Sequence, residues 1–196
     1  MRGIHRCSPF ASLFLLPLFL IGCDRASDVV GPTPDLVRSV ASASAAVHAA
    51  GGGTTTFGVD LDGDGLVNLT HFGFTAVISP DHTAQGHFTC LMAGNAVFLG
   101  LKLMAVQGRV TAGEPDGTSF GGTATVKVLQ AFGNGQASFL QNVPYSVTIS
   151  PGGPGVGTLQ LTVHGVFDGV AGDIAPGNGD YDLATETVRT GGITIR

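Results

Sequence analysis

Between residue 54 and the C-terminus, apolar and polar residues alternate with a period of two, and this alternation most restricts the fold. Neighbouring side chains of a β-strand point to opposite faces of the sheet, so each alternating segment predicts a strand with one buried face. The clearest segments are 72–78, 124–128, 145–149 and 159–163. The glycine-rich segments 133–135 and 151–155 lie beside such segments and predict hairpin connections.

The composition agrees with an all-β fold. Glycine accounts for 31 of the 196 residues, only 12% of the residues are charged, and no segment after residue 51 sustains a helical period. The apolar segment 96–101 predicts a central strand, and segment 191–195 predicts the last one. We count about eight to ten strands, a number and spacing typical of an antiparallel β-sandwich or a partly open barrel.

The N-terminus has the pattern of an export signal. Arg2 and Arg6 precede the apolar segment 10–21, which is interrupted by Pro17 and is shorter than the about 20 residues that span a bilayer. It ends in Leu20-Ile21-Gly22-Cys23, which resembles the signal of bacterial lipoproteins. The resemblance implies cleavage before Cys23 and lipidation of its thiol; the alternative is an ordinary signal peptide with an incidental cysteine.

We therefore expect a signal peptide at 1–22, a lipid anchor and flexible linker at 23–50, and a β-domain at 51–196. The protein would lie in the cell envelope, on the inner or the outer membrane, facing the periplasm or the surface. Loss of Arg2 and Arg6 takes two positive charges from the formal net charge of −5, leaving −7. A balance this acidic argues against nucleic acid as the partner.

The segment from Asp60 to Asn68 resembles the calcium loops of EF-hands, dockerins and thrombospondin type 3 repeats. Such loops need oxygen ligands at alternate positions and a glycine at the sixth, which is Gly65 here. The twelfth position carries His71 instead of an acidic residue, and Asp-Gly pairs are also typical of plain hairpin turns. Both interpretations stay open. The candidate Ca²⁺ ligands are Asp60, Asp62, Asp64, the Leu66 carbonyl and Asn68.

No catalytic residue is predicted. Ser119 lies in a Gly-x-Ser-x-Gly sequence, but a predicted strand follows it where a nucleophile elbow needs a helix. Cys90 is predicted to be buried. The aspartates between residues 168 and 182 are predicted to lie in a solvated loop, and the histidines are predicted to be scattered over the surface; those weighed as metal ligands are His71, His82, His87 and His164.

Four short motifs resemble a family of uncharacterised exported β-domains of environmental bacteria. They are Gly51–Gly53, Gly86-His87-Phe88-Thr89-Cys90-Leu91, Gly94-Asn95-Ala96-Val97 and Gly191–Ile195. The resemblance implies a β fold and no known activity.

The expected function is a non-enzymatic cell-envelope lipoprotein with a structural or adhesive domain, with a bound Ca²⁺ as an open option. Its partners would be the membrane, through the anchor, and an unidentified protein or glycan. One alternative is a small-ligand or carbohydrate-binding module, which predicts exposed aromatic residues such as Phe120 and Tyr181 on a concave face. A remote alternative is a serine hydrolase that uses Ser119.

Overall fold

The computed structural model describes residues 45–60, 63–93, 96, 100–130, 137–167, 174 and 179–196. These residues form one nine-stranded antiparallel sheet. The strands are β1 (Val47–Thr56), β2 (Thr70–Ile78), β3 (Thr83–Ala93), β4 (Leu101–Gly113), β5 (Ser119–Gln130), β6 (Ala137–Ser150), β7 (Thr158–Phe167), β8 (Gly179–Asp182) and β9 (Glu186–Ile195). The predicted all-β antiparallel fold is confirmed.

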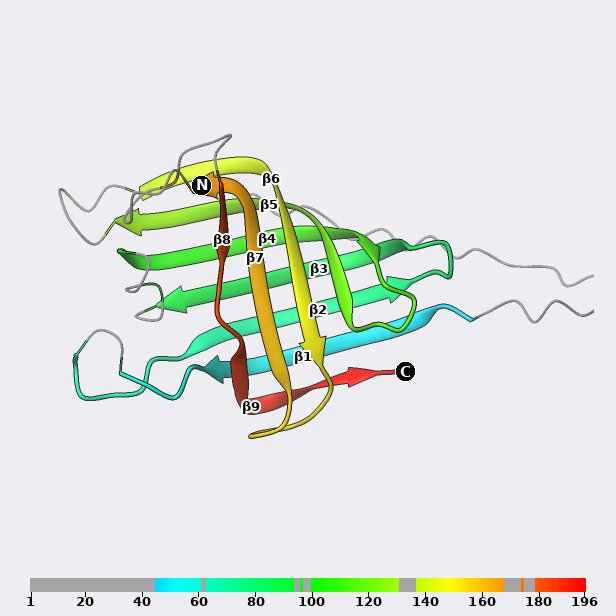
Figure 1. The fold of residues 1–196 in the computed structure, drawn as a ribbon, viewed down its shortest axis with the longest axis horizontal. Helices are drawn as coiled ribbons and strands as arrows, with labels where there is room; N and C mark the ends of the chain where they lie inside the picture. Colours follow the sequence, from blue (N-terminus) through cyan, green and yellow to red (C-terminus); the bar gives the residue numbers. More distant parts are fainter. Residues whose placement is uncertain are drawn as a thin grey trace, which may run out of the picture. The chain divides into compact units, whose positions relative to one another are not determined.

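The sheet closes on itself into a ring, although not into an even barrel. Its strand order is β6-β5-β4-β3-β2-β1-β9-β7-β8, and an additional pairing of β6 with β7 closes the ring. In Figure 1, β7, β8 and the second half of β6 run steeply across β1 to β5. The seam between β7 and β9 is short, with only Thr158 and Leu159 of β7 paired to β9, whereas β6 and β7 pair from residue 145 to 150 of β6.

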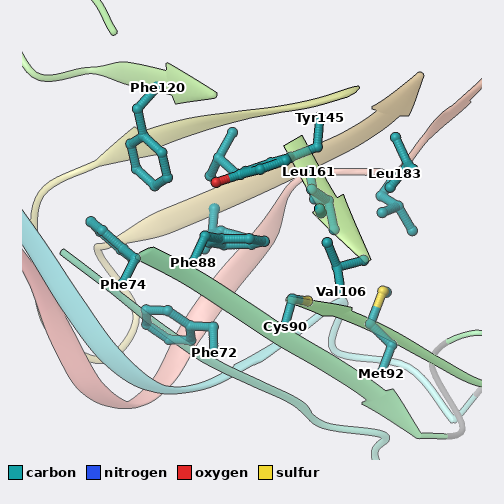
Figure 2. Packing of buried hydrophobic residues seen from close by; sticks show 14 of the residues in the cluster. Phe72, Phe74, Phe88, Cys90, Met92, Val106, Phe120, Tyr145, Leu161 and Leu183 are labelled. Carbon is teal, nitrogen blue, oxygen red and sulfur yellow. The ribbon is translucent and has the colours of Figure 1, made fainter. Parts of the chain in front are cut away.

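The alternation seen in the sequence sets which side chains enter the ring. In β2, Phe72, Phe74, Ala76 and Ile78 are buried, while Thr75 and Val77 between them are exposed. The other strands send in apolar side chains in the same way, so the core lies inside the ring (Figure 2). Burial of this apolar surface is the main force that holds the strands together.

Aromatic rings occupy one part of this core. The Phe88 ring stacks on Tyr145, with centroids 5.3 Å apart, and meets Phe120 edge-on at 6.0 Å (Figure 2). The Tyr145 hydroxyl donates a hydrogen bond of 3.1 Å to the Arg109 carbonyl, and burial raises the pKa of Tyr145. A Cβ at Gly108 would collide with the Tyr145 ring, so the glycine makes room for this aromatic contact.

Two expected boundaries differ from the structure. Strand β1 begins at Val47, so residues 47–50, which the sequence pattern places in the linker, pair with β2 and β9. Strand β4 begins only at Leu101, and Ala96 and Gly100 are turn residues before it. The rest of the strand predicted at 96–101, and the turn predicted at 133–135, lie outside the described residues. The connection predicted at 151–155 is confirmed between β6 and β7.

Candidate functional site

The predicted calcium loop connects β1 to β2, and its first acidic residue binds the loop's own backbone. The two Asp60 carboxylate oxygens accept hydrogen bonds from the N–H groups of Gly63, at 2.7 Å, and Gly65, at 2.8 Å. Both glycines have positive φ angles, 76° and 87°, which other residues adopt only with strain. Asp60 therefore fixes a tight turn.

The remaining candidate ligands are arranged less uniformly. Asp64 accepts a 2.8 Å hydrogen bond from the Leu66 N–H, and the Leu66 side chain is exposed. Asn68 is buried, and its carbonyl accepts a hydrogen bond from the Thr56 hydroxyl. Asp62 lies outside the described residues. No three His, Cys, Asp or Glu side chains come together as a metal site in the described part of the chain, so calcium binding stays a prediction.

A second candidate site is a hollow of about 420 Å³ on the outer face of β3, β4 and β5. Its polar side chains come from two cross-strand rows, His87-Arg109-Thr123 and Thr89-Gln107-Thr125. Asn142 also lines it and has a positive φ of 57°, next to the irregular pairing of β5 with β6. The hollow offers hydroxyl, amide, imidazole and guanidinium groups to a polar ligand.

The aromatic residues expected to face a carbohydrate do not do so. Phe120 and Tyr181 are 1% and 2% exposed and belong to the core, so this part of the prediction is wrong. The alternation that makes them good strand residues also turns them inward. Among the described residues, the large aromatic side chain that is exposed is Phe139, which is 60% exposed and lies under the Lys127 ammonium group, 5.4 Å from the ring centroid.

Three polar residues on β6, β7 and β8 form a third candidate site, which the sequence pattern does not reveal. Ser146 Oγ lies 3.0 Å from His164 Nε2, and His164 Nδ1 lies 2.8 Å from Asp180 Oδ2. We call Ser146, His164 and Asp180 the outer-face triad. The order hydroxyl, imidazole, carboxylate is that of a serine nucleophile with its base and the group that orients the base.

Strand register brings the outer-face triad together. Ser146 pairs with Thr162, which places His164 two residues further along the same face of β7. Thr162 in turn pairs with Asp182, so Asp180 falls beside His164. The members are 18 and 16 residues apart, and no local motif marks them. The sequence signal that points to this site is the alternation of polar and apolar residues. It places Ser146 and His164 on the polar faces of two strands that a hairpin joins.

The outer-face triad is half exposed and its carboxylate is ionised. The side chains of His164 and Asp180 are 38% and 43% exposed. Hydrogen bonds from His164 and from the Gly165 N–H, at 2.8 Å, hold the pKa of Asp180 below its ordinary value. An ionised carboxylate only accepts hydrogen bonds, so Nδ1 of His164 carries a proton, and the nitrogen that faces the Ser146 hydroxyl is Nε2.

Ser146 also borders a hollow of about 320 Å³ on the outer face. Gly121 lies opposite Ser146 across the β5–β6 pair, and both line the hollow together with Gly122, Thr111 and Ser119. Because the glycines carry no side chains, the hydroxyl of Ser146 is approached over bare backbone.

Inside the ring, a different set of polar groups surrounds Glu186. The Thr70 hydroxyl donates a 2.8 Å hydrogen bond to Glu186 Oε1, while Thr55 Oγ1 and Glu186 Oε2 are buried without a well-aligned hydrogen bond. We call Thr55, Thr70 and Glu186 the interior polar cluster. Burial raises the pKa of Glu186, and the nearby Thr55 and Thr70 hydroxyls offset part of that rise.

The other sequence candidates do not form sites. Ser119 begins β5, so it is not on a strand-to-helix elbow. Cys90 is buried as predicted, and burial followed by the charge of Glu186 raises the pKa of its thiol, which disfavours the reactive thiolate. Asp180 and Asp182 lie on β8 and not in a loop, which corrects that prediction. Cys23, Asp168 and Asp173 lie outside the described residues.

The described part of the chain contains no helix long and apolar enough to cross a bilayer. Comparisons of the sequence with protein-family models and with curated proteins, and of the fold with solved structures, find no match in any of the three. The candidate sites therefore have to be judged on their own geometry.

Proposed function

We propose that the protein is a lipid-anchored β-domain of the bacterial cell envelope, with a structural or adhesive role. The observation that supports it most is the separation between the lipoprotein-like Cys23 and the first strand at Val47. A flexible chain of that length has an end-to-end distance of roughly 27 Å, and full extension gives roughly 80 Å. The ring would therefore stand clear of lipid headgroups and present its outer face to a partner.

Replacement of Cys23 tests the anchor. We expect the full chain, expressed in a bacterium with a lipoprotein pathway, to incorporate an alkyne-tagged palmitate and to sediment with membranes. Cys23→Ala should lose the label and leave the membrane fraction, whereas Cys7→Ala, the matched control inside the expected signal peptide, should retain both. Equal membrane association of the wild type and Cys23→Ala would reject the anchor.

A glycan-binding role is the second candidate, and the hollow over β3, β4 and β5 favours it. Arg109, Gln107 and Thr125 present donors and acceptors suited to sugar hydroxyls. We expect Arg109→Ala and Gln107→Ala to lose binding on a glycan array, while Lys102→Ala, an exposed cation outside this hollow, keeps it. Binding unchanged in both hollow variants would exclude this surface.

We propose Ca²⁺ as a stabilising ligand of the Asp60–Asn68 loop. Binding only to the folded state would raise the melting temperature of the full chain by several degrees over that measured with a chelator. The rise should disappear in Asp64→Asn and persist in Asp116→Asn, a turn aspartate outside the loop that accepts hydrogen bonds from Thr118. Melting curves that superimpose with and without Ca²⁺ would reduce the loop to a turn.

A further inference from the structure

The outer-face triad carries an inference that goes beyond the anchoring role and departs from the expectation of a non-enzymatic protein. We propose that Ser146 is a nucleophile, that His164 is its general base, and that together they cleave esters of short acyl chains. Asp180 is a positioning residue, because it acts on the reacting atoms only through His164.

The distances meet the geometric requirement of such a site. A base accepts a serine proton when the heavy atoms are about 2.6–3.2 Å apart, and the Ser146–His164 distance is 3.0 Å. The 2.8 Å contact with Asp180 holds Nδ1 as the protonated nitrogen, which leaves Nε2 as the base. Gly165 N–H fixes the other oxygen of Asp180 at 2.8 Å, so the carboxylate itself is held in place.

The hollow beside Ser146 sets the class of substrate. Its volume is about 320 Å³, and Thr111, Ser119 and Glu114 contribute polar groups to its lining. The large apolar residue in that lining, Phe120, is 1% exposed and offers little surface to a long acyl chain. A short acyl group, such as an acetyl ester of a polar alcohol, fits these walls.

The proposed reaction consumes one water molecule for each ester. As Ser146 Oγ forms a bond to the carbonyl carbon, its proton moves to His164 Nε2 and the carbonyl π pair moves to oxygen. The intermediate collapses, the carbon–oxygen bond to the alcohol breaks, and the alcohol takes the proton from Nε2. Water then attacks the acyl-serine and gives a proton to Nε2. The acid leaves, and Ser146 Oγ recovers its proton from His164.

The adjacent Thr162–Asp182 pair provides a matched control. The Thr162 hydroxyl donates a 2.7 Å hydrogen bond to Asp182, so a second side-chain hydrogen bond to an aspartate joins β7 and β8. Asp182→Asn removes a carboxylate of β8 that is bonded to β7, without touching His164. A loss of reactivity confined to Asp180→Asn, without a matching loss of stability, therefore points to the orientation of His164 and not to the attachment of β8.

The test is labelling of the full chain by a fluorophosphonate, followed by peptide mass mapping. Attack by Ser146 Oγ on phosphorus forms the O–P bond, breaks the P–F bond and releases fluoride, while the serine proton passes to His164. We expect the adduct on Ser146. Ser146→Ala should abolish it, and Ser119→Ala, which alters another serine of the same hollow, should not.

His164→Gln should slow labelling by about a hundredfold or more, the usual contribution of a general base. Asp180→Asn should slow it by at least about tenfold and change its pH profile, whereas Asp182→Asn should leave rate and profile unchanged. Hydrolysis of p-nitrophenyl acetate should follow the same order. An adduct on Ser119, the absence of any adduct on the folded protein, or equal rates for wild type and His164→Gln would overturn the proposal.

Discussion

The interior polar cluster and the outer-face triad combine the same kinds of group in opposite surroundings. Each has a carboxyl group that accepts a 2.8 Å hydrogen bond from another strand, from Thr70 to Glu186 inside the ring and from His164 to Asp180 outside it. Burial raises the pKa of Glu186, whereas hydrogen bonding, mainly to His164, lowers that of Asp180.

The difference shows that position relative to the ring wall decides what a carboxyl group does. Inside, where water is excluded, the uncharged acid is favoured and the group affects the stability of the fold. Outside, the ionised form orients an imidazole, and solvent screens its effect on stability. Substitutions in the two networks should therefore separate stability from reactivity.

The largest effect is expected from Glu186→Ala. It leaves a cavity and removes the acceptor of the buried Thr70 hydroxyl, which should lower the free energy of unfolding by about 2–4 kcal/mol. Glu186→Gln retains an uncharged oxygen acceptor for Thr70, so it should change the free energy of unfolding by less than about 1 kcal/mol. Urea unfolding measures both. Equal losses in the two variants would mean that an uncharged oxygen acceptor at position 186 does not replace the carboxyl group.

The pH dependence of stability should have opposite signs in the two networks. Because the folded-state pKa of Glu186 is raised, the folded chain binds more protons than the unfolded chain above about pH 4.3, the ordinary value for Glu. The contribution of Glu186 to the free energy of unfolding is complete below that pH and is lost as the pH rises through the folded-state pKa. For Asp180, whose pKa is lowered, the contribution is complete above about pH 3.9 and is lost on acidification.

Unfolding free energies measured across pH for the wild type, Glu186→Gln and Asp180→Asn check these signs. The difference in unfolding free energy between the wild type and Glu186→Gln should shrink as the pH rises. The difference between the wild type and Asp180→Asn should shrink as the pH falls. Parallel curves for wild type and Glu186→Gln would show that Glu186 titrates alike in the folded and unfolded chains.

The smallest effect on stability is expected from Asp180→Asn at neutral pH. Asp180 is exposed to solvent, and the substitution weakens only two surface hydrogen bonds of a four-residue strand, those from His164 and from the Gly165 N–H. We expect unfolding free energies only slightly below those of the wild type and of Asp182→Asn, because solvent screens the interaction. A clear decrease in stability confined to Asp180→Asn would assign the outer-face triad a structural role in attaching β8.

The sequence predicts those parts of the fold that have a strong period. Phe72, Phe74 and Ile78 alternate with polar residues, and they enter the core as expected. The start of β1 is not predicted, because its Ala and Gly residues have low strand propensity and show no alternation. These residues form a strand because they pair with β2 and β9. Packing across the ring supplies what local preference does not.

The candidate sites also differ in how far the sequence predicts them. The Asp60–Asn68 segment is visible in the sequence because all of its groups are neighbours along the chain. Ser146, His164 and Asp180 come together only through the registers of β6, β7 and β8, and a single sequence does not give those registers. Asp180 is harder still to predict, because its surroundings are rich in glycine and indicate a loop.

The protonation of His164 tests the central difference between the two networks most directly. We would record an imidazole ¹⁵N–¹H spectrum of the full chain at about pH 8, above the ordinary titration range of histidine, and assign His164 by comparison with His164→Gln. The outer-face triad predicts a neutral ring with its proton on Nδ1, and a shift of that signal in Asp180→Asn but not in Asp182→Asn. A proton on Nε2 would mean that the base does not face Ser146, and a spectrum unchanged by Asp180→Asn would mean that Asp180 does not orient the ring. Either result would contradict the proposed roles of the outer-face triad.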